Sequence, residues 1–395
     1  DSKRPIVFIP VYFGYERVLE ATTYMAELSG KDKESESVFD IFEIFRSLRH
    51  EFGQVTVNFG SPVPLKEFID DNIPEWQSLK EIPPIKLSET SLNLANMLAI
   101  SINKAVAIKS TDLIALALLA TSKQNIEEEY LLKQVELLRQ IARTCIPAGA
   151  SVTSARPEEM LNQAMKIVGL SRIEHAFGSI ISSSKNQSRI LAYNANNVAH
   201  VYTLPSLVLR FVTAKRQTDK IALLEFVTTL YPFLKSEMFL SWAISELNEV
   251  LETIVHLLQE LGLVTTNGQQ LSMPSQETSI QNSIQHIASI TDQPLTRFYT
   301  IMELLQQSIK PTLKNLESAS ASISEKLSIL YGINSTEFFD KSLFSAFLRT
   351  LKSENLLRDD LTVKKDFSLL VSMTAQSLDP DIRYNIFQAV KKFEN

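Results

Sequence analysis

Glycine scarcity is the feature that most restricts what this chain can fold into, because only 10 of its 395 residues are glycine. Nucleotide-binding folds and barrels of alternating strands and helices use glycine at their tight strand-to-helix turns. Hydrophobic residues still make up 45% of the chain, and its length suffices for two or three domains with well-buried cores. The sequence therefore predicts a mainly helical protein.

The charge and the cysteine content exclude several classes of function. The formal net charge is −6, so there is no general electrostatic reason for the chain to bind nucleic acid. Cys145 is the only cysteine, which rules out an internal disulfide and argues against a zinc cluster. We expect Cys145 to be a small buried hydrophobe in a protein of a reducing compartment.

The hydropathy pattern bears on membrane contact. No stretch approaches the roughly 20 apolar residues that a membrane span needs. The most apolar region, residues 92–120, is interrupted by Lys104, Lys109 and Asp112. We therefore expect any membrane contact to be peripheral, or to lie in a part of the protein beyond this sequence.

The N-terminal segment contains a continuous apolar run, residues 5–13 (PIVFIPVYF), which predicts a strand buried on both faces. Pro10 lacks the N–H that a sheet neighbour would accept, so we expect it at the end of the strand or at a sheet edge. A second, shorter strand is predicted at residues 54–59. Because the sequence opens on a core strand without an initiator methionine or a signal peptide, we expect both strands to need partners from a preceding segment.

Two helices are predicted between these strands, at residues 17–28 and 38–49. Strand, helix, helix and strand at this spacing are typical of the end of an α/β domain. Beyond Pro83 and Pro84 the hydrophobic pattern becomes helical. We therefore predict that the chain divides into two parts, an incomplete α/β portion at residues 1–82 and a large helical region at residues 83–395.

The helical region has a long series of predicted elements. Its helices are expected at residues 88–107, 113–120, 125–143, 157–168, 204–214, 220–235, 245–261, 296–309, 323–331 and 341–354, with a last segment after residue 379. Ser88 is the expected N-cap of the first helix. Short hairpins are predicted at residues 180–193 and 263–273, the second around Asn267-Gly268, a pair that suits a type I′ turn.

A helix pair followed by such a hairpin is typical of a winged-helix module, and weakly similar units recur along the chain. One alternative is therefore a non-enzymatic interaction module, including a regulator that binds nucleic acid. In that case the helix before the second hairpin should be basic. Residues 241–265 instead contain four glutamates and neither Lys nor Arg, so phosphates would be repelled there. The alternative survives as a protein–protein interaction module.

Self-contained catalytic machinery is absent from the sequence. The five histidines form no H-E-x-x-H motif, and neither a glycine-rich phosphate loop nor a G-x-S-x-G elbow occurs. We therefore predict no catalytic residue, metal site or cofactor for this chain. His256 is expected to be a packed core histidine. Asn196 and Asn197, just before His200, are expected to cap a helix or shape a turn.

One segment, residues 9–16 (IPVYFGYE), resembles the fourth conserved block of the glycerol-3-phosphate acyltransferases, whose usual form is Ile-Pro-Val/Ile followed by Gly-Tyr-Glu. Further blocks follow in the order of that family. They lie at residues 57–64 (VNFGSPVP), 196–207 (NNVAHVYTLPSL), 230–237 (LYPFLKSE) and 331–341 (YGINSTEFFDK). Together they extend over nearly the whole chain and indicate the large bacterial, membrane-bound type.

The resemblance implies a chemistry. Enzymes of the family transfer a fatty acyl group from acyl-CoA or acyl carrier protein to the sn-1 hydroxyl of glycerol 3-phosphate, giving lysophosphatidic acid in the first step of phospholipid synthesis. The His and Asp of their H-x-x-x-x-D motif provide a base and the carboxylate that orients it. Arginines of a Glu-Gly-x-Arg-Ser block hold the phosphate. Both motifs precede the fourth block and neither occurs here.

The resemblance also assigns an environment to the chain. It should be inactive alone, work with a preceding N-terminal half, and belong to an enzyme bound peripherally to the cytoplasmic face of the bacterial inner membrane. The acyl-chain preference, the choice of donor and the oligomeric state stay open.

Six residues of this block are assigned to substrate binding by the resemblance: Ile9, Pro10, Val11, Gly14, Tyr15 and Glu16. The apolar end of the strand is expected to help line a groove for the acyl chain. Glu16 is expected to pair with a cation from the preceding half. From the residues alone, the same segment is a core strand and its turn, and the two interpretations are compatible.

Overall fold

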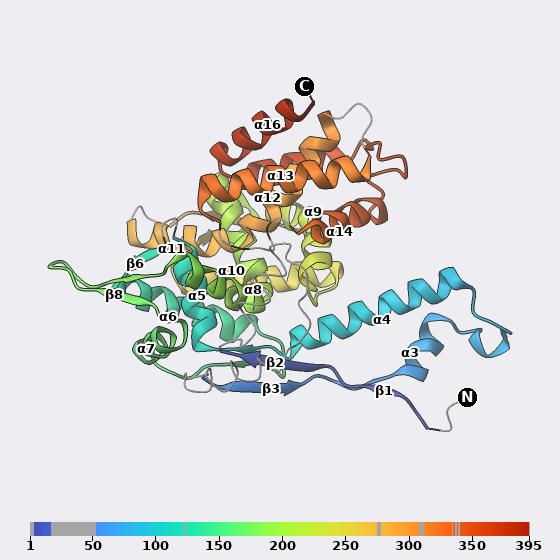
Figure 1. Ribbon diagram of the computed structural model, residues 1–395, viewed down its shortest axis with the longest axis horizontal. Helices are drawn as coiled ribbons and strands as arrows, with labels where there is room; N and C mark the ends of the chain where they lie inside the picture. The colour runs from blue at the N-terminus through green and yellow to red at the C-terminus, as the bar shows by residue number, and fades with distance from the viewer. Residues whose placement is uncertain are drawn as a thin grey trace, which may run out of the picture.

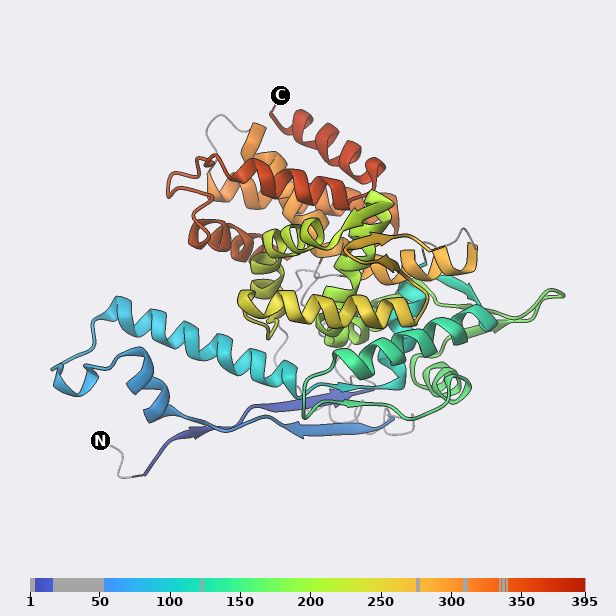
Figure 2. The ribbon, with the colours of Figure 1, turned by 180° about the vertical axis from the view of Figure 1, so that it is seen from behind.

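The computed structural model describes residues 4–16, 53–121, 124–274, 278–307, 312–333, 335, 338 and 340–394. The predicted helices at residues 17–28 and 38–49 lie outside the described residues. Most of the described chain is helical, and its short strands form small separate sheets. The prediction of a mainly helical protein with a partial α/β segment is confirmed. A ribbon of strands and a projecting pair of helices lie along one side of a layered helical body (Figure 1, Figure 2).

The ribbon consists of antiparallel strand pairs. Its strands are β1 (Val7–Phe8) with β4 (Val63–Pro64), and β2 (Val11–Tyr15) with β3 (Val55–Phe59). Tyr12 and Gly14 on β2 are buried, whereas Phe13 and Tyr15 between and beyond them are 55% and 42% exposed. The predicted strand at residues 5–13 is therefore interrupted, and its burial on both faces is wrong. Among the described residues the ribbon has helices against one face only, so the alternate side chains stay open.

The projecting pair consists of α3 (Leu65–Asn72) and α4 (Pro84–Lys104). The helix α4 begins at Pro84, because proline is favoured at the first position of a helix, where its missing N–H would have no partner. Ser88 lies inside α4, so its prediction as the N-cap is wrong. The chain leaves α4 at Lys104 to form β5 (Ala107–Ile108), which pairs in parallel with β7 (Ser151–Val152).

Two successive units of the helical body share the strand and helix order of a winged helix. The first consists of α5 (Ser110–Leu119), β6 (Asn125–Glu127), α6 (Glu128–Cys145), α7 (Pro157–Val168), β8 (Ser171–Ile173) and β9 (Ile180–Ser182). The second consists of α8 (Lys185–Lys215), β10 (Gln217–Asp219), α9 (Lys220–Met238), α10 (Leu247–Glu260), β11 (Thr265–Asn267) and β12 (Gln270–Ser272). In both units the third strand lies between the first and the second.

The hairpin predicted at residues 263–273 is confirmed by β11 and β12. The hairpin predicted at residues 180–193 is wrong, because β9 pairs with β8 and β6 instead. The helix α8 starts directly after β9, where the Ser184 hydroxyl accepts a hydrogen bond from the Gln187 N–H. A polar segment that suggested a turn is thus the cap of the longest described helix.

The C-terminal layer is built from helices. They are α11 (Thr278–Ala288), α12 (Asp292–Gln307), α13 (Leu313–Tyr331), α14 (Lys341–Ser353), α15 (Phe367–Ser377) and α16 (Pro380–Glu394). An isolated antiparallel bridge between Leu357 and Val363 follows α14. The order of helices and bridge resembles a third, reduced copy of the two units. Figure 1 shows α12, α13 and α16 stacked on the side of α8 that faces away from the ribbon.

One continuous core extends from Tyr12 on β2 to Val390 on α16. Its centre is α8, whose residues from Val198 to Val212 are nearly all buried. The ribbon is therefore packed onto the helical body. Among the described residues, no helix combines the length and the apolar character needed to cross a bilayer.

Candidate functional site

The residues assigned to substrate binding lie on β2 and at its two ends, and they divide between the two faces of the ribbon. Ile9 and Tyr15 are 56% and 42% exposed, and Val11 is half-buried. Pro10 is buried, and its carbonyl oxygen accepts a hydrogen bond from the Gly60 N–H at 2.8 Å. The exposed side chains are therefore open to another segment or a ligand, while Pro10 holds the ribbon together.

Glu16 fastens the ribbon to the first winged-helix unit. Its side chain is 3% exposed. The Oε2 atom accepts hydrogen bonds from the Gln54 backbone N–H at 2.8 Å and from the Gln163 side-chain amide on α7 at 2.7 Å. Gly14 leaves room for a neighbouring cation, because a Cβ there would lie 3.3 Å from Lys109 Nζ. The pairing of Glu16 with a cation from another part of the protein stays a prediction.

A buried ion pair lies beneath the ribbon. Lys109 Nζ is 2.7 Å from Asp112 Oδ2, and the two side chains are 6% and 0% exposed. The ammonium group also lies 5.9 Å from the centre of the Tyr12 ring. Burial raises the pKa of Asp112 to about 6, against the opposing effect of Lys109. Lys109 and Asp112 are two of the charged residues that interrupt the apolar region at residues 92–120. The sequence showed that they were unusual there, but not that they form an ion pair.

A pocket of about 490 Å³ lies between the ribbon and the helical body, and we call it the large pocket. Its polar and aromatic lining includes Tyr12 and Phe13 from β2, Asn196, Asn197 and His200 from α8, Glu237 from α9 and Arg297 from α12. Residues from three of the conserved-looking blocks thus meet at one space. None of the six residues assigned to substrate binding lines it, although Tyr12 and Phe13 lie between them. The resemblance to the family blocks therefore identified the segments that reach the pocket, but not the residues that line it.

His200 lies between the large pocket and a second space. Its Nε2 atom is 3.3 Å from the carbonyl oxygen of Asn103, to which it donates a hydrogen bond as the neutral imidazole. Burial lowers the pKa of His200 to about 4. Asn196 and Asn197 lie inside α8, so their predicted capping role is wrong, because packing of α8 overrides their preference for turns.

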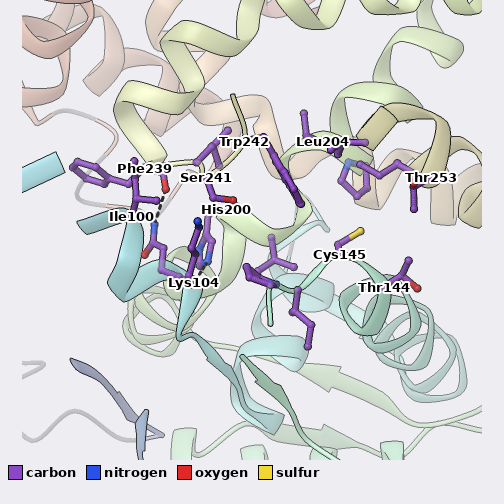
Figure 3. Close-up of a pocket in the computed structure, with 18 residues that line it drawn as sticks. Ile100, Lys104, Thr144, Cys145, His200, Leu204, Phe239, Ser241, Trp242 and Thr253 are labelled. Atoms are coloured by element: carbon purple, nitrogen blue, oxygen red, sulfur yellow. Dashed lines mark hydrogen bonds between the residues drawn. The ribbon is translucent and has the colours of Figure 1, made fainter. Parts of the chain in front are cut away.

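The second space, the small pocket, has a volume of about 160 Å³ and shares Asn103, His200 and Phe239 with the large one. Figure 3 shows His200 beside Lys104, with Cys145 and Thr253 farther along the lining. Cys145 is half-buried, and burial raises the pKa of its thiol to about 12, so the thiol stays protonated. The lining suits a ligand that is largely apolar.

The loop between α9 and α10 forms part of the wall of both pockets. The carbonyl oxygen of Trp242 accepts hydrogen bonds from the Tyr231 hydroxyl at 2.9 Å and from Lys235 Nζ at 2.7 Å. Both donors belong to the block at residues 230–237. The block therefore positions the loop that carries Phe239 and Trp242 into the pocket walls.

A second buried ion pair, Glu237 with Arg297, lies in the wall of the large pocket, with side chains that are 11% and 6% exposed. Burial raises the pKa of Glu237, and the guanidinium of Arg297 opposes that shift. The Nε atom of Arg297 has no hydrogen-bond partner among the described residues. Arg297 was not predicted, since a single arginine in a helical pattern carries no signal of its own.

The arrangement favours binding over acid–base catalysis. His200 contacts a backbone carbonyl, and with a pKa of about 4 it is too weak a base to activate a hydroxyl at neutral pH. The described residues contain no group of three or more His, Cys, Asp or Glu side chains placed to hold a metal ion. The prediction of His256 as a packed core residue is wrong, because its side chain is 73% exposed. Its Nδ1 atom lies 3.6 Å from Glu260 Oε1.

Comparison with known proteins shows the family of the chain. The family model of the glycerol-3-phosphate acyltransferase C-terminal region matches residues 24–360. The chain belongs to this family. Three curated glycerol-3-phosphate acyltransferases, from Pseudomonas paraeruginosa PA7, Pseudomonas aeruginosa UCBPP-PA14 and Pseudomonas fluorescens SBW25, are 36%, 36% and 34% identical to it.

These alignments cover 98% of this chain and 48% of each relative. The chain thus spans about half the length of the curated acyltransferases it matches, and it corresponds to their C-terminal region. The family predicted from the sequence blocks is confirmed. The described pockets therefore lie in the C-terminal region of an acyltransferase family.

Proposed function

We propose that this chain is the C-terminal part of an enzyme that transfers a fatty acyl group from acyl-CoA or acyl carrier protein to the sn-1 hydroxyl of glycerol 3-phosphate. The observation that carries the proposal is the alignment of 98% of the chain with glycerol-3-phosphate acyltransferases. No histidine of the chain is followed by an aspartate five residues later. The catalytic base and its orienting carboxylate then come from the other half, and this chain alone is inactive.

The role of the chain in such an enzyme is to complete and support the catalytic domain. Residues 1–82 provide the last strands of that domain, and residues 83–395 form the helical support. Three contacts between the ribbon and the helical region support this role. Tyr12 belongs to the common core, and Glu16 accepts a hydrogen bond from Gln163. The Asn58 side-chain amide donates to the Ala105 carbonyl at 2.9 Å. The exposed face of the ribbon meets the other half, where Ile9, Val11 and Tyr15 help to line the substrate groove.

The test uses the full-length product of the gene. Glu16→Ala leaves the Gln54 N–H and the Gln163 amide without their acceptor, which loosens the ribbon. We expect acylation of glycerol 3-phosphate to fall at least tenfold in kcat. Glu325→Ala on the exposed surface of α13 is the control and should keep full activity. A folded full-length protein without acylation activity would overturn the proposed reaction, and an unaffected Glu16→Ala enzyme the proposed role of the ribbon.

Membrane contact at the cytoplasmic face of the bacterial inner membrane is part of the same proposal. Its support is the apolar surface of the projecting helix α4, where Ile85, Leu87 and Leu92 are 75%, 51% and 61% exposed. Exposed apolar side chains on a helix can enter the headgroup region of a bilayer. Flotation with phospholipid vesicles should carry the full-length protein, and the double variant Ile85→Asp/Leu92→Asp should float less. Equal flotation of both would remove α4 from the account.

The alternative, a non-enzymatic interaction module, has its own support in the two winged-helix units. Sedimentation of the purified 395-residue chain distinguishes the acyltransferase part from the interaction module. The ribbon of an acyltransferase part has an open apolar face and strand edges, so the chain should self-associate. A stable monomer that captures a defined protein would favour the interaction module.

A further inference from the structure

We propose that the small pocket binds an uncharged, largely apolar molecule of about the size of phenol, which donates one hydrogen bond to His200. The inference goes beyond the proposed acyl transfer, because it assigns a ligand to the helical region whatever reaction the whole protein catalyses. The pocket has a volume of about 160 Å³, and an apolar cavity of about 150 Å³ is large enough to hold benzene. The volume therefore favours a single ring or a short branched chain.

The apolar body of the ligand is favoured by most of the lining. Ile146 follows α6, Leu204 lies on α8, and Ile254 lies on α10. Leu240 and Trp242 come from the loop between α9 and α10 (Figure 3). Leu204, Leu240 and Ile254 are also members of the common core, so this part of the wall is held in place. A ring that enters the pocket removes apolar surface from water on both sides.

His200 supplies the acceptor. The Asn103 carbonyl oxygen, 3.3 Å from His200 Nε2, can only accept, so Nε2 carries the proton. Burial lowers the pKa of His200 to about 4, which keeps the imidazole neutral at pH 7.5 and leaves Nδ1 with a free lone pair. No described residue donates to Nδ1, and Nδ1 is not one of the fully enclosed atoms that lack a partner. It is therefore open to the space that His200 lines.

A proline inside α8 adds a second acceptor to the same wall. Pro205 has no N–H, so it cannot donate to the carbonyl of Val201, the residue four positions earlier that a regular helix would pair with it. Both residues line the small pocket. A ligand without a donor would cover these acceptors and leave them without a hydrogen bond, which is unfavourable. A ligand that brings an O–H or N–H group is therefore favoured.

The charge of the ligand follows from the other polar side chains. Lys104 lines the pocket with an exposed side chain, so a cation would be repelled. A carboxylate would bring only acceptors toward His200 Nδ1, and its attraction to the exposed Lys104 is screened by solvent. The Asn103 amide and the Thr253 hydroxyl already donate to backbone carbonyls at 2.9 Å and 3.2 Å. Three further polar side chains can donate or accept: Thr144, Cys145 and Ser241.

The first arm of the test varies the ligand. Trp242 lines the small pocket, and a Trp76→Phe background leaves it as the only tryptophan, so its fluorescence reports on this pocket. The 395-residue chain is titrated at pH 7.5 with phenol, with anisole, whose oxygen has no hydrogen, and with benzoate. We expect saturable binding of phenol, with anisole about fivefold and benzoate about tenfold weaker. Absence of phenol binding, equal affinity for phenol and anisole, or tighter binding of benzoate would overturn the proposal.

The second arm fills the pocket. Val250 is a half-buried lining residue of α10, and Val250→Phe should weaken phenol binding about tenfold. Asn248→Phe, the same substitution at an exposed position of α10, should leave binding unchanged. Gln293→Phe narrows the large pocket only and should leave it unchanged as well. Unchanged affinity in Val250→Phe, or a loss in Gln293→Phe, would contradict the assignment to the small pocket.

The third arm removes the acceptor. His200→Phe keeps a ring in the wall but has no nitrogen, so phenol should lose its advantage over anisole. If thermal unfolding shows that His200→Phe does not fold, His200→Asn replaces it, because its shorter side chain cannot reach both the Asn103 carbonyl and the ligand. A phenol preference that survives in the folded variant would overturn the role of His200.

Discussion

Two buried arginines of the helical body each lie against a carboxylate from a distant part of the chain. Arg210 on α8 pairs with Asp292 at the start of α12, and its guanidinium also donates to the Ser377 carbonyl. Arg297 on α12 pairs with Glu237 on α9. Removing one member of such a pair leaves an uncompensated charge in the interior, which costs far more than the pair itself contributes. These side chains therefore tie the C-terminal layer to the central helices.

The Glu237–Arg297 pair gives the first residue-scale prediction. Glu237→Ala leaves the 6%-exposed guanidinium without its counterion, and the free energy of unfolding should fall by about 3–5 kcal/mol. The double variant Glu237→Leu/Arg297→Met removes both charges and should recover most of that loss. Urea unfolding at pH 7 measures both. A loss below about 1 kcal/mol in the single variant would contradict the buried pair.

His200 gives the second, a pH dependence. Its pKa is lowered from the ordinary 6.5 to about 4, so the unfolded chain binds the proton more tightly than the folded one. The stability that a neutral His200 contributes is complete above pH 6.5 and is lost as the pH falls toward 4, about 2 kcal/mol of it between pH 7.5 and 5.

His200→Gln can still donate to the Asn103 carbonyl but does not titrate. Its free energy of unfolding should therefore fall by about 2 kcal/mol less than that of the wild type over this pH interval. Urea unfolding at the two pH values decides the matter. Parallel losses in the two proteins would contradict a low pKa for His200.

Individual contacts of the site could be predicted only in part. Lys109 and Asp112 stand out in the sequence as charges within an apolar region, and the structure joins them at 2.7 Å. Arg297 and Glu237 are 60 positions apart, and nothing local in either segment connects them. The hydrophobic pattern of the sequence likewise did not show that Tyr12, rather than the adjacent Val11 or Phe13, enters the core.

At the scale of elements, the ends of a helix were predictable where a cap is written in the sequence. The helix α7 has the predicted bounds Pro157–Val168, because Pro157 suits its first position and Gly169 takes the left-handed conformation after it, with φ of 79°. The sequence did not predict the long helix α8 as one element, because Asn196, Asn197 and Pro205 favour turns or interruptions. Burial of α8 in the core outweighs those local preferences.

The cap of α8 supplies the element-scale prediction. Ser184 and Gln187 form a reciprocal capping box, in which the Ser184 N–H donates to Gln187 Oε1 at 2.7 Å. Ser184→Ala should lower the free energy of unfolding by about 1 kcal/mol, and Ser184→Gly by only a few tenths. Thermal or urea unfolding of the two variants measures the difference. Equal losses would mean that the hydroxyl does not cap the helix.

At the scale of the whole molecule, the helical body and the ribbon form one packed unit with one open face. The mainly helical fold followed from the glycine count and the hydrophobic periodicity, and the family followed from the sequence blocks. What covers the exposed Tyr15 and Phe59 could not be derived from this chain, because the apolar pattern of a strand is the same whether its cover comes from this segment or from another. The match to half of each relative supplies a candidate, the other half of the acyltransferase.

The most direct test of the account is an acylation assay with glycerol 3-phosphate and acyl-CoA, run on this chain alone and on the full-length product of its gene. We predict lysophosphatidic acid only from the full-length protein, since this chain has no H-x-x-x-x-D motif. Turnover by the chain alone, or none by a folded full-length protein, would contradict it.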